Sequence, residues 1–311
     1  LWHGSLPDAG QHSEMKRRVG RARVEAFESL DVDAVAAHDD PMDALRASVG
    51  GMHIDSSATL EEQAIAVWGR VPVALAVWSR ARHGDRSIAP DASASHAADV
   101  LRMLTGEAPS EGAARMVDAY LTTVSEHGMN ASTFTARVIA STGSDLVSAI
   151  TGAIGALKGP LHGGAPGPVL DMLDAIGAPE LAEPWIRAEL SQGRRIMGMG
   201  HRVYRVRDPR AAIFEQALER WADDTPRRAL ALATEAAATR VLAERYPERG
   251  LQANVEFYTS VLLEAAGVPR ELFTPLFAVG RAVGWAAHVR EQRETGRLLR
   301  PLAMYVGDDF G

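Results

Sequence analysis

The sequence predicts an all-α fold, and three observations lead to that prediction. Apolar residues recur with helical spacing along most of the chain. Residues that cap helices repeatedly stand just before these periodic runs. Alternating apolar runs joined by hairpin turns, which would indicate β-strands, are missing from the sequence. We therefore expect helices almost everywhere and no substantial sheet.

Two helix starts are marked by specific residue pairs. Thr59 and Glu62 have the spacing of a capping box, in which each side chain bonds the backbone N–H of the other residue. The apolar-periodic run that follows continues to about Arg82. Asp208-Pro209 places a capping residue before a proline, which is favoured at the first helical position because it has no N–H to leave unpaired. That pair predicts a helix over residues 209–222.

Further signals near the C-terminus predict two more helices and the break between them. Thr225-Pro226 repeats the cap-and-proline pattern and heads a helix over 226–245. Gly267, followed by Val268-Pro269, is typical of a helix end, since glycine adopts the left-handed conformation there and proline cannot continue the helix. We expect the next helix to run from about Glu271 to Gln292.

Bulk composition limits the class of protein. With 311 residues and 33.3 kDa, the chain is long enough to bury a substantial core. The net charge of −7 argues against nucleic acid as a partner, and no apolar run is long enough for a membrane span. The absence of cysteine excludes disulfides and thiolate metal sites and favours a cytoplasmic location. The sequence has no signal peptide and begins at Leu1, so we expect a further N-terminal segment that it lacks.

Two stretches rich in glycine and proline, 159–168 and 193–200, interrupt the helices and are candidate hinges or site loops. Three histidines lie in such breaks in the helical pattern, namely His127, His162 and His201. Taken singly, each is more often a capping, packing or solvent-exposed residue than a functional one. They indicate a functional site only if the surrounding residues imply one chemistry for all three.

Three common kinds of site fit these histidines poorly. Zinc is disfavoured because the three lie far apart in sequence, without a paired histidine spacing or a cysteine, so no metal site is predicted. The glycines of "GMGHRV" lack the third glycine of a dinucleotide fingerprint and follow no clear strand. The segment "LHGGAPGP" has no Lys-Ser/Thr after its glycines and is therefore no phosphate loop.

Carbon-acid chemistry fits them better. A neutral imidazole can donate a hydrogen bond to a carbonyl oxygen that becomes negatively charged during reaction. Arginines nearby would bind carboxylates in bidentate geometry, which implies carboxylic-acid substrates. The reaction also needs a base that removes a proton from carbon, and "NVEFYTS" offers Glu256 at the start of a helix. Taken alone, however, such a glutamate is usually a surface residue.

Five blocks of sequence, in order, resemble the citrate synthase family: "EHGMNASTFTARVIASTGSDL", "GPLHGG", "IMGMGHRVYRVRDPRA", "NVEFYTSVLLEAAGVP", and "FAVGRAVGWAAHVREQ" leading to "RLLRP". The resemblance extends from "LWHGSLP" to "YVGDD" and is strongest to the short bacterial enzymes, particularly the second citrate synthase of actinobacteria. The 2-methylcitrate synthases are near relatives of that group. The resemblance implies an acyltransferase of the tricarboxylic acid cycle.

The family resemblance also implies an architecture. A large helical domain, residues 1–163 and 268–311, would carry a smaller inserted helical domain, residues 164–267, with the active site in the cleft between them. The enzyme would work as a cytoplasmic homodimer. Its substrates would be oxaloacetate and acetyl-CoA, without a cofactor, and neither nucleic acid nor a membrane would be a partner.

Three catalytic roles follow from the resemblance. His162 would stabilise the enol of acetyl-CoA, and Glu256 stands where the family has its catalytic base. His201 would polarise the ketone of oxaloacetate and protonate its oxygen as the carbon–carbon bond forms.

Binding roles follow in the same way. His127, Arg210 and Arg281 match oxaloacetate-binding positions, and His201 contacts the same substrate. Arg300 matches an arginine that reaches this site from the partner subunit. Arg205 is a weaker match to a basic residue near the CoA phosphates.

The sequence departs from the family pattern at three places. The base is aspartate in most members, and Glu256 is one methylene longer. Pro166-Gly167 replaces the commoner Asn-Glu, and Gly128 replaces a glutamate that usually follows the histidine. These changes leave domain closure and substrate selectivity open, but not the class of reaction. Three alternatives remain: an enzyme that takes acetyl-CoA, one that takes propionyl-CoA to give 2-methylcitrate, and a non-catalytic helical module that binds or regulates. The retained histidines and arginines argue against the third.

Overall fold

The computed structural model describes residues 1–55, 57–162, 166–200, 207–222 and 225–307. The α-helices in these ranges are α1 (Ala9–Ser29), α2 (Val32–Ala36), α3 (Pro41–Gly50), α4 (Leu60–Arg82), α5 (His96–Thr105), α6 (Glu111–Val124), α7 (Ala131–Ser141), α8 (Leu146–Lys158), α9 (Pro166–Ile176), α10 (Ala182–Ser191), α11 (Pro209–Trp221), α12 (Pro226–Arg245), α13 (Val255–Ala265) and α14 (Phe273–Thr295). Short 3₁₀ turns are formed by Pro179–Leu181, Pro247–Arg249 and Arg270–Leu272. The described ranges contain no β-strand, only an isolated bridge between Met199 and Ala253. The prediction of an all-α fold is confirmed.

Helix starts follow the capping residues of the sequence. The Thr59 backbone N–H donates to Glu62 Oε2 at 2.7 Å, and the Glu62 N–H donates to Thr59 Oγ1 at 3.3 Å, so the predicted capping box is formed. Asp208 and Thr225 cap α11 and α12 through their side chains. These bonds satisfy N–H groups that have no partner inside the helix.

One predicted boundary was wrong by a few residues. Gly267 ends the preceding helix as expected, with a φ of +79°. The next helix was expected over Glu271 to Gln292, but the chain first makes the 3₁₀ turn Arg270–Leu272 after Pro269, and α14 then runs from Phe273 to Thr295. The helix ends beyond Gln292 because the next glycine, Gly296, supplies the left-handed cap with a φ of +65°.

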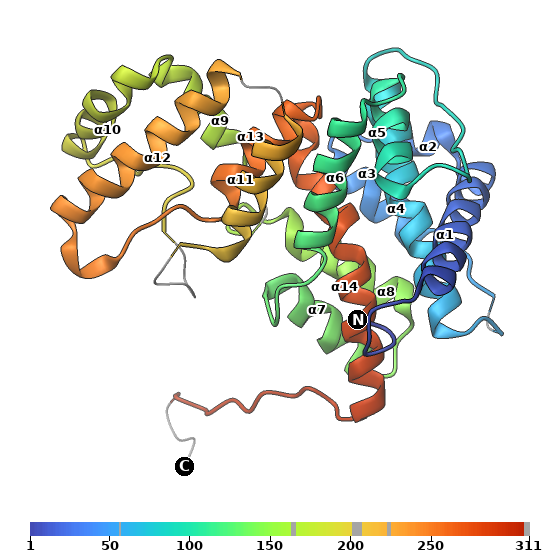
Figure 1. Ribbon diagram of the computed structural model, residues 1–311. Helices are drawn as coiled ribbons and strands as arrows, with labels where there is room; N and C mark the ends of the chain where they lie inside the picture. Colours follow the sequence, from blue (N-terminus) through green and yellow to red (C-terminus); the bar gives the residue numbers. More distant parts are fainter. Residues whose placement is uncertain (56, 163–165, 201–206, 223–224, 308–311) are drawn as a thin grey trace.

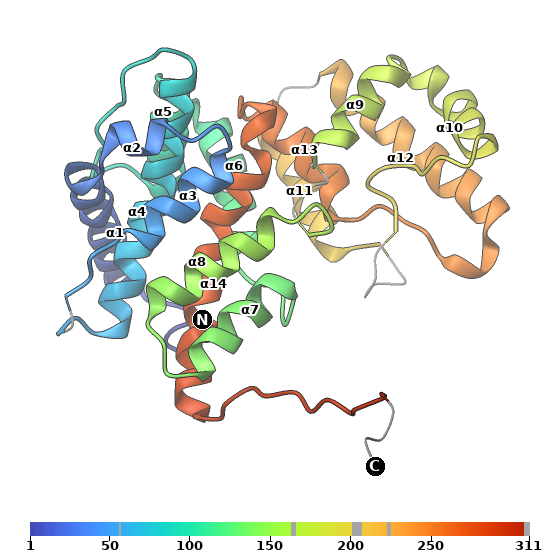
Figure 2. The ribbon, with the colours of Figure 1, turned by 180° about the vertical axis from the view of Figure 1, so that it is seen from behind.

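The ribbon has two ends of different composition (Figures 1 and 2). We call α1–α8 together with α14 the large lobe, and α9–α13 the small lobe. Helices α9, α10 and α12 form the end of the molecule opposite α1, and α11 and α13 lie between them and α6. Within the described residues, no helix combines the length and apolar character that a membrane span requires. The predicted domain boundaries at 163/164 and 267/268 stay a prediction.

Helix α14 crosses the large lobe and packs closely on the end of α6. A Cβ atom at Gly280 would lie 2.5 Å from Val124 Cγ2, and one at Gly284 would lie 1.9 Å from the Ser125 carbonyl oxygen. Only glycine allows the two helices to approach to this distance. The side chain between the two glycines is that of Arg281, which is 1% exposed.

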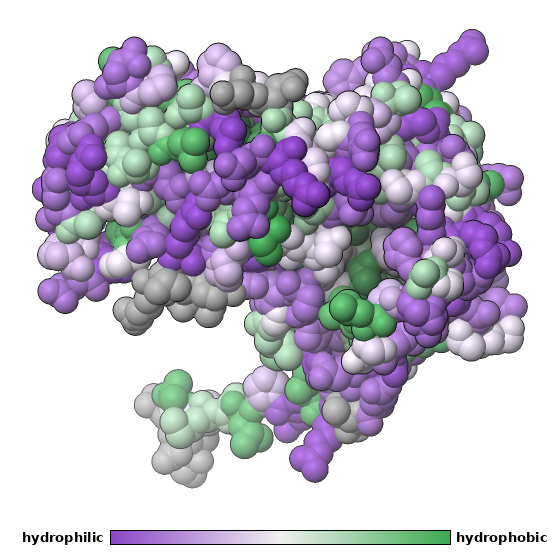
Figure 3. Space-filling model, in the orientation of Figure 1, coloured by the Kyte–Doolittle hydropathy of each residue, from purple (hydrophilic) through white to green (hydrophobic). Residues whose placement is uncertain are grey.

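Beyond α14 the chain continues as an extended tail, residues 297–307, that leaves the large lobe (Figure 1). Its start is held by the Leu299 N–H, which donates to Ser141 Oγ at 3.0 Å. Several large apolar side chains of the tail are exposed, and Figure 3 shows its green surface standing apart from the body. These residues are Leu298, Leu302, Met304, Tyr305 and Val306.

Candidate active site

Glu256 is the second residue of α13, and the cap of that helix holds its backbone. Asn254 Oδ1 accepts the Glu256 N–H at 3.0 Å. Burial raises the pKa of the Glu256 carboxyl to about 7, the charge of Arg210 lowers it, and the charge of Asp208 raises it. Among the described residues the carboxyl has neither an ion-pair partner nor a hydrogen-bond partner. A carboxyl with a pKa near 7 in a partly buried setting is suited to take a proton at neutral pH.

The glycine turn before residue 201 is bonded to the segment that leads into α13. The Gly200 N–H donates to the Gln252 carbonyl at 2.7 Å, and the Asn254 N–H donates to the Gly198 carbonyl at 2.9 Å. Gly198 and Gly200 have φ values of +71° and +88°, which other residues adopt only with strain. The turn therefore needs its glycines. His201 and Arg205 lie outside the described residues.

Arg210 lies in the first turn of α11 and is buried, at 8% exposure. Its Nε and Nη2 donate to the two carboxylate oxygens of Asp208, at 3.1 and 2.7 Å. Asp208 thus caps the helix and holds the guanidinium along one edge. Arg210 Nη1 has no hydrogen-bond partner within the described residues, so a ligand carboxylate can meet the guanidinium at that nitrogen.

His162 lies in the turn after α8, and Ser132 of α7 fixes its ring. The Ser132 backbone N–H donates to His162 Nε2 at 3.3 Å, and the Ser132 hydroxyl lies 2.8 Å from the same nitrogen. That hydroxyl also accepts a hydrogen bond from Trp285 Nε1 at 3.1 Å.

This arrangement selects one tautomer of His162. Burial lowers the pKa of the imidazole, a hydrogen bond to its own backbone raises it, and the charge of Arg281 lowers it; the net shift is downward. The ring is therefore neutral at pH 7. Because Nε2 accepts a backbone N–H, the proton sits on Nδ1, which is the nitrogen of this ring that can donate to an oxygen.

Arg281 projects from α14 and donates from Nε to the Val124 carbonyl at 2.6 Å, at the C-terminus of α6. Burial lowers its pKa to about 10, whereas the charge of Glu126 raises it and that of Arg210 lowers it. The charges of Arg210 and Arg281 thus act on each other, although the two residues come from different lobes. The guanidinium stays charged at neutral pH.

The remaining two predicted residues have different surroundings. His127 is half-buried in the segment between α6 and α7, next to Gly128, whose N–H donates to Glu126. Arg300 is exposed on the extended tail that follows α14. Among the described residues, no group of three or more histidine, aspartate and glutamate side chains could hold a metal ion.

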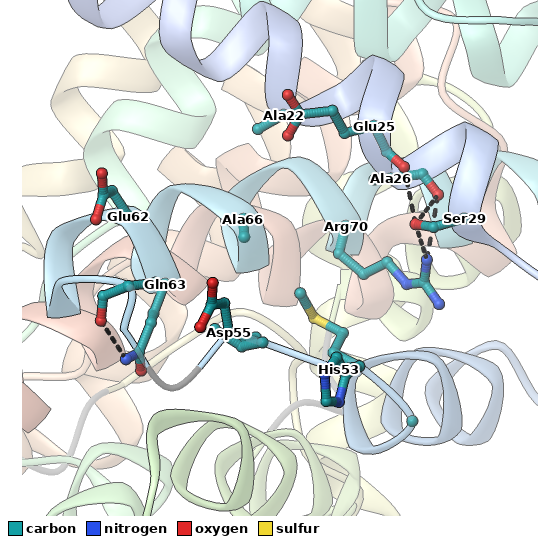
Figure 4. A pocket seen from close by; sticks show the side chains of 14 residues that line it. Ala22, Glu25, Ala26, Ser29, His53, Asp55, Glu62, Gln63, Ala66 and Arg70 are labelled. Atoms are coloured by element: carbon teal, nitrogen blue, oxygen red, sulfur yellow. Dashed lines mark hydrogen bonds between the residues drawn. The ribbon is translucent and has the colours of Figure 1, made fainter.

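A cavity of about 420 Å³ lies elsewhere, between α1, α4 and the segment before α4 (Figure 4). None of the predicted site residues lines it. Arg70 at its edge donates to the carbonyls of Ser48 and Ala26, near the C-terminal ends of α3 and α1. These negative helix ends stabilise the buried guanidinium, so Arg70 has protein partners and is not a free cation at the edge of the cavity.

Sequence reasoning missed Ser132 and gave Asp208 only the role of a helix cap. Ser132 is 30 residues from His162 and 153 from Trp285, and nothing in the sequence links these positions. The one available signal for Asp208 was its spacing of two residues from a candidate arginine.

The family model described as "Citrate synthase, C-terminal domain" matches residues 1–302. The citrate synthase of Haloferax volcanii is 41% identical, over 99% of this chain and 84% of that protein. The 2-methylcitrate synthase 2 of Corynebacterium glutamicum is 38% identical, over 99% of this chain and 83% of that protein.

A solved structure agrees with the sequence comparisons. It is citrate synthase of Thermoplasma acidophilum in a ternary complex with carboxymethyl coenzyme A and oxaloacetate. The TM-score is 0.85 at 28% identity, covering 99% of this chain and 84% of that one. The matches span nearly the whole chain and agree in fold. The chain therefore belongs to the citrate synthase family.

Proposed function

We propose that the protein condenses acetyl-CoA with oxaloacetate and water to give citrate and CoA. The observation that carries this proposal is Glu256, a carboxyl at the start of α13 whose pKa burial raises to about 7. A thioester α-carbon is a very weak acid, and its deprotonation needs a positioned base of this kind. Family membership supports the same reaction, since the relatives matched over the whole chain are named for it or for its propionyl counterpart.

His162 supplies the second half of the enolisation. As Glu256 removes a proton from the thioester, negative charge develops on the carbonyl oxygen, and the Nδ1–H of His162 donates a hydrogen bond to that oxygen. The donor is fixed in advance, because Ser132 holds Nε2 on the other side of the ring. Donors that need no reorganisation during reaction stabilise a developing charge most effectively.

Oxaloacetate is the second substrate in this proposal. Its carboxylates bind Arg210 and Arg281, with His127 as a further contact, while His201 polarises the ketone and protonates its oxygen. Because Arg210 stands on the small lobe and Arg281 on the large one, oxaloacetate draws residues 164–267 toward the rest of the chain. Arg205 would contact the CoA phosphates, and no cofactor takes part.

The proposal includes a homodimer, located in the cytoplasm, in which Arg300 completes the partner's site. The exposed apolar tail that carries Arg300 supports it, since such a tail is better covered by a second subunit than by water. Mixed dimers of Arg300→Ala and His162→Ala chains should regain activity, because one of their two sites has neither lesion. Mixed dimers without activity would place Arg300 in its own subunit's site.

The test of the reaction is thiol release with acetyl-CoA and with propionyl-CoA, each with and without oxaloacetate. We expect oxaloacetate-dependent release that is faster with acetyl-CoA. The C. glutamicum relative makes the propionyl reaction the second candidate, and one methylene in an apolar pocket changes the rate by roughly 10- to 200-fold. Faster release with propionyl-CoA would identify a 2-methylcitrate synthase, and no release with either would leave a non-catalytic module.

A further inference from the structure

Two polar atoms near the candidate site are buried and have no hydrogen-bond partner among the described residues. They are the hydroxyl of Tyr120 and Nη2 of Arg281. Tyr120 is 0% exposed and Arg281 1%. A buried donor without a partner destabilises a folded protein, so such an atom calls for an explanation, and an absent ligand is one.

Helix packing brings these two residues to the same part of the large lobe. Arg281 lies between Gly280 and Gly284, where α14 approaches α6 closely, and it bonds the Val124 carbonyl one turn after Tyr120. The Tyr120 ring packs on Phe214, with the ring centroids 5.8 Å apart. Phe214 is one turn after Arg210 on α11, so Tyr120 lies at the junction between the large lobe and the helix that carries Arg210.

The charges around the hydroxyl agree with this position. Burial raises the pKa of Tyr120, the charge of Arg281 lowers it, and the charge of Glu256 raises it. The hydroxyl is therefore close enough to both a candidate substrate-binding arginine and the candidate base for their charges to act on it. It stays protonated at neutral pH and is available as a donor.

The chemistry of the two unpaired atoms indicates what they need. A guanidinium nitrogen can only donate, and a protonated tyrosine hydroxyl donates readily. Neither atom is bonded to the other in the structure. A carboxylate has two oxygens and accepts several hydrogen bonds, so it can satisfy both donors and offset the positive charge of Arg281.

We propose that Tyr120 is a further substrate-binding residue, whose hydroxyl donates to the oxaloacetate carboxylate that Arg281 also holds. The inference rests on the proposed function, because it takes oxaloacetate as the ligand of Arg281. It adds a contact from α6 to a site otherwise built from α11, α13, α14 and the loops.

The variant Tyr120→Phe tests the proposal, because it removes the hydroxyl and keeps the ring on Phe214. We expect the Kd of oxaloacetate, measured by calorimetry without thioester, to rise roughly tenfold, as for loss of a hydrogen bond to a charged group. KM for oxaloacetate should rise in parallel. The melting temperature of the unliganded variant should stay equal or rise by about 2 °C, since an unsatisfied group has been removed.

The matched control is Thr234→Val on α12, which removes another fully buried hydroxyl that has no partner among the described residues. It should also keep or raise the melting temperature, but it should leave oxaloacetate binding unchanged. A purely structural Tyr120 would behave like Thr234, and an unchanged Kd in Tyr120→Phe would overturn the proposal.

Failure of the proposed function has a different signature. In that case the unsubstituted protein would neither bind oxaloacetate nor release thiol, and the role of Tyr120 would be overturned together with the reaction. If the unsubstituted protein binds oxaloacetate normally and Tyr120→Phe does so equally well, only the inference about Tyr120 fails.

Discussion

The two lobes present different kinds of chemistry to the candidate site. The large-lobe face, formed by Tyr120, His162 and Arg281, consists of donors: a neutral imidazole, an unpaired guanidinium nitrogen and a free hydroxyl. The small-lobe face, formed by Arg210 and Glu256 with Asp208, carries two carboxylates, and its arginine is already paired with Asp208, whereas on the large-lobe side Glu126 is the carboxylate whose charge acts on Arg281.

This difference separates the two tasks of an enolisation. Stabilising a developing negative oxygen needs donors, and removing a proton needs a carboxylate whose charge is not already neutralised by a partner. On the small-lobe face, Asp208 competes with substrate for Arg210, and burial raises the pKa of the Glu256 carboxyl. The donors of the large lobe and the base Glu256 of the small lobe lie on separate faces. They therefore do not pair with each other before a substrate binds between them.

The largest expected effect comes from abolishing the base on the small-lobe face. Glu256→Gln keeps the shape of the side chain but cannot accept a proton, so we expect kcat to fall by about 10³-fold with oxaloacetate affinity nearly unchanged. Thiol release under saturating substrates measures it. Glu264→Gln, on the same helix but ion-paired with Arg227 near the surface, should keep normal turnover. Near-normal release by the Glu256 variant would remove this residue from the mechanism.

A second prediction concerns stability against pH. The pKa of Glu256 is about 7 in the folded protein against 4.5 for an ordinary glutamate carboxyl, so between these values the folded state binds the proton that the unfolded state has lost. Stability therefore falls as pH rises through this window, by about 3 kcal/mol. Urea unfolding at pH 5 and pH 8 measures the free energy of unfolding of both proteins. Relative to the unsubstituted protein, Glu256→Gln should be more stable at pH 8 than at pH 5 by that amount. A constant difference would mean that Glu256 has an ordinary pKa.

Shortening the base is expected to have a smaller effect. Glu256→Asp restores the residue that most of the family carries, but it withdraws the carboxylate by one methylene from a site built around glutamate. We expect kcat to fall by about 10²-fold, as for a misplacement of about 1 Å. Turnover faster than that of the unsubstituted protein would instead show that the backbone is not adjusted to glutamate and that Glu256 lowers the rate.

The smallest effect is expected on the large-lobe face. Ser132→Ala removes the hydroxyl next to His162 and the acceptor of Trp285, but the backbone N–H still selects the tautomer. The expected loss in kcat is about tenfold, which corresponds to the free energy that one hydrogen bond contributes. Ser79→Ala, at a buried serine of α4, is the control and should not change kcat. A loss as large as that of Glu256→Gln would show that the hydroxyl, rather than the N–H, fixes the ring.

The contrast between the two faces also explains what could be predicted from sequence. Helix starts at Thr59, Asp208 and Thr225 were predictable because a capping bond spans only two or three residues. The candidate residues came from ordered motifs, and their roles stay predictions. The bond between Ser132 and His162 could not be foreseen, because it depends on how α7 packs beside the turn after α8. The hydroxyl of Tyr120 lacks a hydrogen-bond partner among the described residues because of how the helices pack, and the local sequence does not indicate this.

The close contact between α6 and α14 has a mechanical consequence. At Gly280 and Gly284, α14 has no side chain of its own toward α6, and an added Cβ atom would lie 2.5 Å from Val124 Cγ2 and 1.9 Å from the Ser125 carbonyl oxygen, so the two helices are tightly packed against each other there. Arg281 lies between these glycines, so its backbone is held in a fixed position relative to α6 and to the substrate. Any change in its separation from Glu256 during a catalytic cycle has to be made by displacing the small lobe.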